Sequence, residues 1–330
     1  MKYIVNNSND PRYNLAFEEY SFKYLPKDED YLILWINGPS IIVGKNQNTI
    51  EEVNLNYINE NDILVVRRVT GGGAVYHDLG NLNFSIIANS DELGVIDFKK
   101  YNIPIEQALN KLGAKAQLSG RNDITIDGKK VTGIAQSIWK GRVLNHGAIL
   151  FDTDLGVLAE ALNVKQDKIE SKGIKSVKSR VANIKQFLRD DIGIEEFKRV
   201  LMNYIFEFAG EKPEEYVLNE KQKEEINKLF KEKYSTWEWN FGSSPSFNYK
   251  NYKRFPFGSI EVRLQIDNGK IKESKIFGDF FGSGNIEELE DLLVGQRYDK
   301  KHMAEFLQSK NLRKYFGDIK DNEFLELLFG

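Results

Sequence analysis

The chain has 330 residues, of which 41% are hydrophobic and 29% are charged, which is an ordinary balance for a globular protein. The formal net charge of -3 argues against a generally basic surface, so we expect no nucleic-acid partner. The sequence has no cysteine, which excludes disulfides, thiolate metal sites and a cysteine nucleophile, and its three histidines argue against a His-rich metal site.

The sequence offers no candidate for a targeting or membrane segment. Residues 1–7 lack the apolar core of a signal peptide. The best apolar run, residues 31–36, is far shorter than the roughly 20 residues that a membrane-spanning helix needs. We therefore expect a cytoplasmic protein with no membrane partner.

Short helices and strands are predicted over the first third of the chain. Asp10 before Pro11 is typical of a helix start, because Asp caps the helix and Pro fits its first position, and this helix would run to about residue 24. Strands are predicted at residues 31–35 and 41–43, and a short helix near residues 51–59. Apolar runs at residues 63–66 and 82–86 predict two strands that flank a Gly-rich segment.

The middle of the chain is predicted to be rich in hairpins. Pro104 predicts the start of a helix that Gly113 ends. Asp127-Gly128 between two alternating segments is a strong signal for a hairpin of residues 123–126 and 130–137. Residues 143–151 form a further predicted strand. Since strands outnumber helices and many are joined by hairpins, we expect an α+β fold with a mixed, mostly antiparallel sheet.

The last part of the chain predicts a second domain. Apolar residues between 197 and 208 have helical spacing and predict a helix packed on the main sheet, and one more helix is expected within residues 210–234. Composition shifts near residues 242–245. The pattern then predicts a hairpin of residues 262–266 and 271–277 and helices at 286–293, 302–308 and 322–328. We expect a catalytic, ligand-binding domain of residues 1–242 and a small α+β accessory domain of residues 243–330.

The most informative segment is residues 67–78, which read RRVTGGGAVYHD and connect two predicted strands. Glycines let backbone N–H groups approach a ligand closely, and Arg67 and Arg68 offer donors for phosphate or carboxylate. We interpret this loop as an anion cradle. The alternative is a connecting hairpin with two solvated arginines, but three consecutive glycines favour the cradle.

Further candidate side chains lie on the predicted hairpin. Asn122 could read a purine edge and Asp123 could contact ribose or Mg²⁺, although both are also ordinary turn formers. Lys130 begins the second strand. The small residues Gly133 and Ala135 follow it and would let a ligand lie against the backbone.

Two histidines and a basic segment complete the candidates. A lone histidine in a strand, such as His146, is more often structural than catalytic. His77 is better placed, and we favour a hydrogen-bonding anchor for the loop over a general base. Residues 165–180 carry six basic and two acidic residues among glycines and serines. They fit either a solvated charged loop or a lid over a polyphosphate.

These segments together resemble the lipoate–protein ligase family, the ATP-dependent enzymes that attach lipoate to carrier domains. The order and spacing match at residues 67–81 (RRVTGGGAVYHDLGN), 120–123 (GRND), 130–133 (KVTG), 146–147 (HG) and 172–183 (KGIKSVKSRVAN). The likeness runs from the N-terminus through the C-terminal unit. It implies a catalytic domain shared with biotin ligases and the small accessory domain of complete ligases.

The resemblance also implies site residues. Lys130 falls on the key lysine of the family, and residues 165–183 fall on its adenylate-covering loop. The implied ATP and adenylate contacts are Arg68, Gly73, Ala74, Val75, Tyr76, Asn122, Asp123, Lys130, Ser179 and Arg180. The implied lipoate contacts are Arg68, Gly72, Gly73, His77, Lys130, Gly133 and His146. Candidates for an apolar slot are Val75, Tyr76 and Ala135.

The expected activity follows from the resemblance. The enzyme would use ATP and Mg²⁺ to activate lipoate or octanoate as acyl-AMP. The residues that bind Mg²⁺ are not identified by the resemblance. The acyl group would pass to a lysine of lipoyl carrier domains of 2-oxoacid dehydrogenase complexes or of the glycine cleavage H protein. The absence of cysteine argues against the thioester route of the related transferases. Two alternatives stay open: a transferase that starts only from preformed lipoyl-AMP or another carrier, and a non-catalytic acyl-nucleotide-binding protein.

Overall fold

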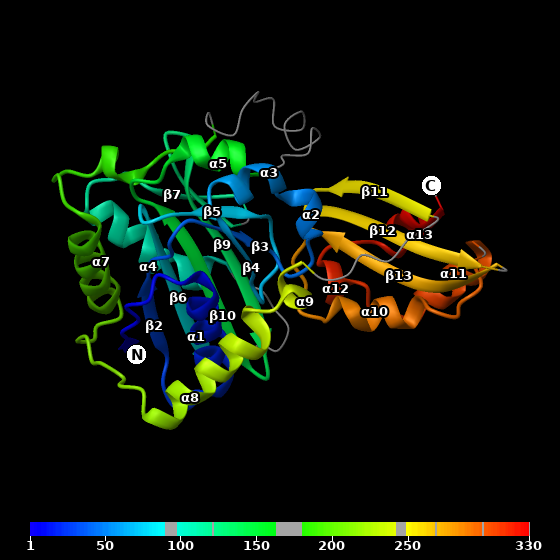
Figure 1. Ribbon diagram of the computed structural model, residues 1–330, viewed down its shortest axis with the longest axis horizontal. Coiled ribbons are helices and arrows are strands. Elements are labelled where there is room, and N and C mark those ends of the chain that lie inside the picture. Colours follow the sequence, from blue (N-terminus) through cyan, green and yellow to red (C-terminus); the bar gives the residue numbers. More distant parts are fainter. Residues whose placement is uncertain are drawn as a thin grey trace.

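Two units lie side by side in the computed structural model (Figure 1). The larger unit contains the blue-to-yellow-green N-terminal part of the chain, and the smaller one contains the gold-to-red C-terminal part. The structure describes residues 1–89, 98–120, 122–162, 180–241, 249–267, 269–298 and 300–329. No helix in these ranges is long and apolar enough to cross a membrane.

A seven-stranded sheet forms the centre of the larger unit. Its strands, in spatial order, are β1 (Lys2–Ile4), β2 (Tyr31–Trp35), β6 (Asn81–Asn89), β10 (Arg142–Leu150), β9 (Lys129–Trp139), β8 (Asp123–Ile126) and β7 (Gln117–Ser119). β1 and β2 are parallel, and the other neighbours are antiparallel. The expected α+β fold with a mixed, mostly antiparallel sheet is therefore confirmed.

A smaller sheet carries the Gly-rich segment. Its order is β4 (Leu64–Arg67), β3 (Ser40–Val43) and β5 (Val75–His77), with β3 parallel to β4 and antiparallel to β5. The segment thus joins two strands, as predicted. The single helix expected at residues 51–59 is wrong, because Val53 is extended between α2 (Thr49–Glu52) and α3 (Leu55–Glu60) and bridges to Leu162.

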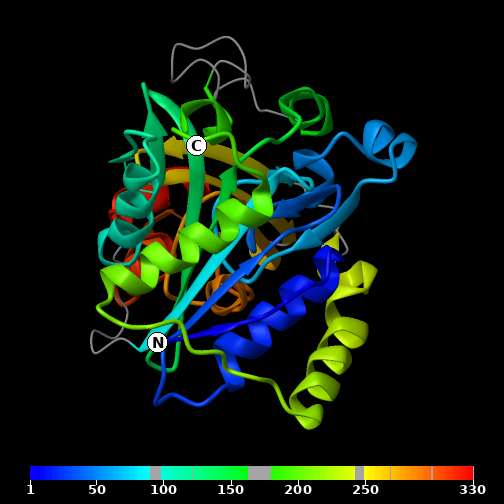
Figure 2. The same cartoon turned by 90° about the vertical axis from the view of Figure 1, so that its left-hand side faces the viewer.

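Helices cover both faces of the large sheet (Figure 2). On one face, α4 (Phe98–Lys111) and α7 (Ile194–Phe208) share a core with Leu32 and Phe84. On the other face, α1 (Pro11–Tyr24) and α8 (Glu220–Leu229) share a core with Ile33 and Ile87. The alternation of these residues along β2 and β6 is what sends them to opposite faces. Smaller elements are α5 (Leu155–Ala161), a 3-10 turn (Ile184–Phe187), a π-helical turn (Phe230–Tyr234) and α9 (Trp237–Asn240).

Of two predicted helix starts, one is confirmed and the other is wrong. Asp10 accepts a hydrogen bond from the Arg12 N–H and Pro11 is the first residue of α1, so this start is confirmed. Pro104 does not begin α4 but lies inside it. Proline removes one helical hydrogen bond. The burial of Tyr101 and Ile105 on either side of Pro104 holds the helix in place, since most helical stability in proteins comes from packing.

The C-terminal unit has its own sheet and core. The predicted hairpin is present as β12 (Gly258–Asp267) and β13 (Lys270–Gly278), and β11 (Tyr249–Phe255) adds an unpredicted antiparallel strand. The sheet packs with α10 (Ile286–Leu293), α11 (Lys300–Gln308), α12 (Arg313–Phe316) and α13 (Asp321–Phe329). The boundary expected after residue 242 falls outside the described ranges.

Candidate active site

The site is built on one lateral row of residues across the large sheet. Trp35 on β2 is paired with Asn83 on β6, Asn83 with Ala148 on β10, Ala148 with Gly133 on β9, and Gly133 with Asp123 on β8. Residues paired across strands project to the same face. Because Gly133 and Ala148 are small, this face is hollow in the middle of the row.

A cavity of about 140 Å³ lies over this row. Leu15 of α1, Ile42 of the small sheet and Phe281 of the C-terminal unit line it as well. Among the expected site residues, its lining includes Arg68, Gly72, Gly73, Ala74, Val75, His77, Asn122, Lys130, Gly133, Ala135 and His146. The cavity therefore collects most of the residues that the sequence singled out.

Tyr76 is the exception on β5, and its expected place in the apolar slot is corrected. Val75 and His77 line the cavity, but the Tyr76 side chain is buried with Ile41 and Val65 on the opposite side of the small sheet. Successive side chains of a strand point to opposite faces, so Tyr76 can reach a ligand only through its backbone.

The Arg68 guanidinium is hydrogen-bonded to the backbone of the glycine loop. It donates to Thr70 Oγ1 (3.0 Å), to the Ile42 carbonyl (3.0 Å) and to the Gly71 and Gly73 carbonyls (2.7 and 2.8 Å). Burial lowers the pKa of Arg68 to about 10, so the group stays charged at neutral pH. Most of its N–H donors thus stabilise the conformation of the loop, and its positive charge lies in the wall of the cavity.

Arg67 organises a neighbouring loop and does not line the cavity. Its guanidinium donates to the carbonyls of Gly44 (2.9 Å) and Gln47 (2.7 Å) and to Thr49 Oγ1 (2.6 Å). Arg67 and Arg68 are 9% and 6% exposed. The alternative of two solvated arginines is therefore wrong.

A buried hydrogen-bond chain ties α1 to the glycine loop. Glu18 Oε1 lies 2.7 Å from His146 Nδ1, and His146 Nε2 lies 2.7 Å from Thr70 Oγ1, which also accepts from Arg68. Ser85 donates to the same Glu18 oxygen. His146 is thus a bonded structural residue that also lines the cavity. No sequence signal pointed to Glu18, and none assigned a role to Thr70 within the segment 67–78, because only the tertiary fold brings both residues to His146.

His77 is held neutral in a single tautomer. Asn14 donates to Asn37 Oδ1 (2.9 Å), so the Asn37 amide nitrogen faces His77 Nδ1 (3.0 Å) and donates to it. The proton of His77 therefore lies on Nε2. Burial, together with the positive charge of Arg68, lowers the pKa of His77 to about 3. These contacts favour the expected anchor over a general base.

Acid is expected to destabilise the protein through His77. Its folded pKa of about 3 lies below the ordinary 6.5, so the unfolded chain takes up the proton first, and stability is lost as pH falls from about 6.5 toward 3. Between pH 7 and pH 5 this one group accounts for about 2 kcal/mol of unfolding free energy. Urea unfolding at both values should show that His77→Gln loses less than the wild type. An identical loss in both proteins would contradict the buried neutral histidine.

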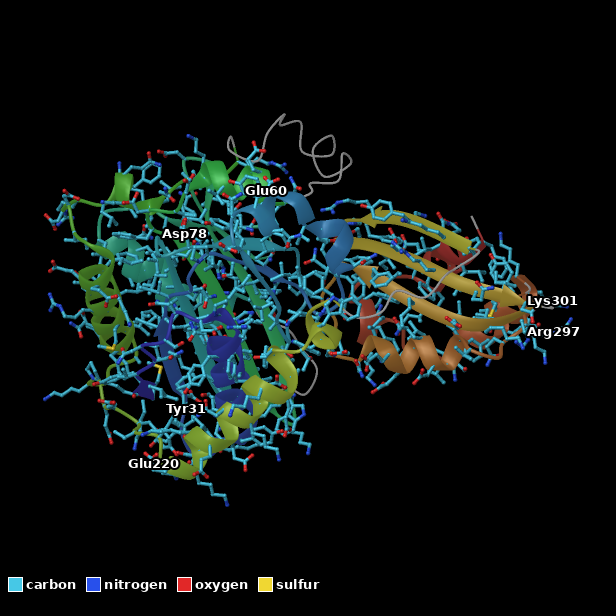
Figure 3. The ribbon with its side chains drawn as sticks, viewed as in Figure 1. Tyr31, Glu60, Asp78, Glu220, Arg297 and Lys301 are labelled. Carbon is cyan, nitrogen blue, oxygen red and sulfur yellow. The ribbon has the colours of Figure 1, made fainter. Side chains whose placement is uncertain are left out.

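Asp78 closes the turn after β5 (Figure 3). Its carboxylate accepts from the backbone N–H groups of Gly80 (2.9 Å) and Asp154 (2.8 Å). A side chain at Gly80 would come within 2.1 Å of the Asp152 carbonyl. Asp78 and Gly80 therefore serve the backbone and do not line the cavity.

Lys130 lies at the β8–β9 side of the cavity. Its Nζ is 2.8 Å from Asp123 Oδ1, and its side chain is 35% exposed. A Cβ atom at Gly133 would lie 3.0 Å from this Nζ, so the glycine leaves room for the lysine. The Lys130 N–H donates to the Arg180 carbonyl, and its carbonyl accepts from Ala182. The end of the basic segment thus lies beside Lys130. The rest of that segment, including Ser179, falls within residues 163–179, which are outside the described ranges.

The Asn122 amide is used by the fold. Its Nδ2 donates to the Ile134 carbonyl (2.8 Å), and the Ile134 N–H donates back to the Asn122 carbonyl (3.0 Å). This geometry fits the ordinary turn-forming role of asparagine. It leaves Oδ1 as the amide atom that could read a purine edge.

The C-terminal unit supplies one wall of the cavity. The Phe281 ring lies against Gly72 and packs edge-on against Phe98, with 5.5 Å between ring centroids. Gly278 N–H donates to the Asn46 carbonyl (2.7 Å), and Lys45 Nζ donates to Asn285 Oδ1 (2.9 Å). No sequence signal pointed to Phe281, because the contact joins two separate units.

Comparison with known proteins assigns the chain to a family. Residues 10–206 match the family described as lipoyl protein ligase A/B catalytic domain, and residues 244–328 match the bacterial lipoate protein ligase C-terminus. The first match alone covers more than half of the chain. The chain belongs to the lipoate–protein ligase family.

Relatives of this lipoate–protein ligase match it over their full length. Lipoate-protein ligase LplJ of Bacillus subtilis is 52% identical, covering 100% of both chains. Lipoate–protein ligase 1 of Staphylococcus aureus is 49% identical, covering 99% of this chain and 100% of that one. The structure of P. falciparum LipL1 in complex with lipoate has a TM-score of 0.81 at 29% identity, covering 98% and 97%. A lipoate-protein ligase A structure bound with ATP has a TM-score of 0.64 at 32% identity, covering 73% and 98%.

These findings confirm the resemblance that the sequence indicated. The protein is a lipoate–protein ligase, and neither alternative, the non-catalytic binding protein or the transferase without activation, gains support. The two matched ranges, 10–206 and 244–328, lie on either side of the domain boundary expected after residue 242.

Proposed function

We propose that this ligase activates lipoate or octanoate with ATP in the cavity above Gly133 and Ala148 and then transfers the acyl group to a carrier lysine. The observation that carries the assignment of the site is the shape of the cavity. It has the Lys130–Asp123 pair at its β8–β9 side and apolar walls, including Trp35 and Leu15, at the other. A carboxylate with an apolar tail matches both ends.

In the first half-reaction, the substrate carboxylate attacks the α-phosphorus of ATP and pyrophosphate leaves. Two anions meet in this step, so the main requirement is fixed positive charge. The Lys130 ammonium is proposed to contact the carboxylate and the α-phosphate. Arg68 adds its buried charge beneath the loop, and the backbone N–H groups of the loop glycines are proposed to face phosphate oxygens.

In the second half-reaction, the ε-amine of a carrier lysine attacks the carbonyl carbon of acyl-AMP. The tetrahedral intermediate collapses to the amide, and AMP leaves with the bonding electrons. Lys130 is proposed to stabilise the oxyanion of this intermediate, as it stabilises the carboxylate before it. The basic segment is proposed to cover the adenylate and exclude water, and the backbone hydrogen bonds of Lys130 with Arg180 and Ala182, at the end of this segment, support that role.

Mg²⁺ is part of the proposal and would neutralise phosphate charge. The described residues do not bring three His, Asp or Glu side chains together as a metal site. Mg²⁺ commonly binds through substrate phosphates, waters and only one or two carboxylates. Asp123, next to Lys130, fits the part of such a carboxylate.

The carriers in this proposal are lipoyl domains of 2-oxoacid dehydrogenase complexes and the glycine cleavage H protein, and the reaction is placed in the cytoplasm. Support comes from the ligase names of the relatives, which imply a protein substrate. The decisive experiment incubates the protein with ATP, Mg²⁺, lipoate and a panel of purified carrier domains. Pyrophosphate release and a carrier mass increased by one lipoyl group are expected. A carrier that keeps its mass while pyrophosphate is released would contradict the transfer step.

A further inference from the structure

The carboxamide of Asn83 is an unusual group in the wall of the cavity. Asn83 is 2% exposed, and its Nδ2 has no hydrogen-bond partner among the residues that the structure describes. No residue in the described part of the chain bonds its Oδ1 either. A buried polar group without a partner costs free energy, so such a group calls for an explanation.

Another buried amide of the same sheet is fully engaged. Asn145 on β10 donates to Asn102 Oδ1 (2.9 Å), and its own Oδ1 accepts from Gln136 (2.8 Å). This network lies away from the cavity and joins the sheet to α4. Asn81, on the same strand as Asn83, also has an Nδ2 with no partner among the described residues, but Asn81 does not line the cavity. Asn83 does line it, so a ligand in the cavity can reach the Asn83 amide.

Asn83 lies at the far end of the cavity from Lys130. Along the lateral row, Gly133 belongs to the strand of Lys130, and Ala148 and then Asn83 follow on the next two strands. Neighbouring strands are about 4.8 Å apart, so Asn83 is roughly 10 Å from that strand. An extended lipoyl or octanoyl chain has a comparable length. With the carboxyl group at Lys130, the tail therefore ends at Asn83.

Other residues in the wall of the cavity indicate which kind of ligand tail would bind near Asn83. Trp35 is the next residue of the row and supplies an apolar wall. The Nε2 of His77, which carries the proton, also lines the cavity without a partner among the described residues. The wall of the cavity therefore combines the apolar Trp35 with two N–H groups that have no acceptor within the described part of the chain. It suits a ligand tail that is apolar yet carries weak acceptor atoms.

We propose that Asn83 is a specificity-determining residue that distinguishes lipoate from octanoate. The dithiolane sulfurs of lipoate are weak hydrogen-bond acceptors, and one of them receives the Asn83 N–H. The terminal methyl group of octanoate accepts nothing and leaves the amide unpaired. A site that presents a buried polar group discriminates against an analogue that lacks the matching atom. The inference rests on the proposed function, since it requires that these acids be activated in this cavity.

The test compares the activation of the two acids. Asn83→Leu keeps the approximate size of the side chain and removes both polar atoms. The ratio of kcat/KM for lipoate to that for octanoate, measured by pyrophosphate release, is expected to fall by about three- to tenfold. Asn89→Leu is the matched control, because Asn89 is at the exposed end of the same strand, and its ratio should equal that of the wild type.

A measurement of unfolding stability distinguishes a specificity role of Asn83 from a structural role. Removing an unpaired polar group from a buried site should leave the midpoint of urea unfolding unchanged or raised in the free protein. Should Asn83→Leu fail to fold, Asn83→Ala and Asn83→Ser provide the same ratio from a shortened side chain. An unchanged ratio in a folded variant would overturn the proposal. A wild-type protein that releases no pyrophosphate with either acid would instead overturn the proposed function.

Discussion

Replacing Lys130 with alanine is expected to abolish adenylate formation while leaving the fold intact. The ammonium is a partly exposed positive charge at the polar end of the cavity, and loss of one such electrostatic contact commonly costs about 10²–10³ in rate. The Lys130–Asp123 pair is partly exposed, and pairs of this kind contribute about 0–1 kcal/mol to stability. Pyrophosphate release with lipoate should therefore collapse, and the urea midpoint should barely change.

The neighbouring Lys129 provides a matched control for this experiment. It is exposed at the turn of the β8–β9 hairpin and does not line the cavity, so Lys129→Ala should keep wild-type activity. Supplying preformed lipoyl-AMP tests the second half-reaction by itself, and Lys130→Ala should also slow this transfer. Near-normal ATP-dependent lipoylation by Lys130→Ala would remove Lys130 from the mechanism.

Short-range rules predicted the β8–β9 hairpin that carries Lys130. Asp127 and Gly128 have φ values of 49 and 75 degrees, which only a few residue types adopt readily, and the sequence places an Asp-Gly pair at that point. The turn pairs Thr125 with Lys130, but the register then shifts by one residue between Ile124 and Thr125 and brings Asp123 opposite Gly133. The hairpin was therefore predictable from residues close together in the chain, whereas the register shift that brings Asp123 opposite Gly133 was not.

The partners of Arg67 and Arg68 were not predictable in the same way. Two adjacent guanidinium groups indicate an anion site, because their donors match phosphate and carboxylate. In the structure most of these donors bind backbone carbonyls, in loops 44–49 and 71–73. Carbonyl groups carry no sequence signature, so residue types alone could not identify them as the acceptors.

The residues that the sequence missed are brought to the cavity by long-range packing. Glu18 comes from α1, Asn83 from the middle of β6, and Phe281 from the C-terminal unit. Glu18 and Asn83 belong to segments that are predictable by themselves, such as the helix after Asp10, whereas Phe281 lies between a predicted strand and a predicted helix. Which face of that segment meets the glycine loop depends on the order of strands in the sheet, and this order is set by the whole fold.

Substituting alanine for Gly72 should damage both stability and activation. Gly72 has a φ of 92 degrees, which costs an L-residue about 1–2 kcal/mol. Its new Cβ would lie 2.9 Å from Arg68 Nη2 and 2.9 Å from Phe281 Cζ, and overpacking of this kind costs about 1–3 kcal/mol. Arg68 is pinned by two carbonyls and Phe281 by Phe98, so neither side chain can withdraw easily.

Gly73 provides the comparison that isolates this effect. A Cβ at Gly73 would meet no atom within 4 Å, so Gly73→Ala should unfold at nearly the wild-type urea concentration, whereas Gly72→Ala should lose about 2–5 kcal/mol. In Gly72→Ala, the displaced loop should also slow pyrophosphate release by about 100-fold, because small misplacements of a catalytic site have effects of that size. Adding Phe281→Leu to Gly72→Ala removes the ring edge and should restore part of the stability but not the cost of the backbone conformation. If Gly72→Ala were as stable as Gly73→Ala, both the positive φ of Gly72 and the contact of Phe281 with the glycine loop would be contradicted.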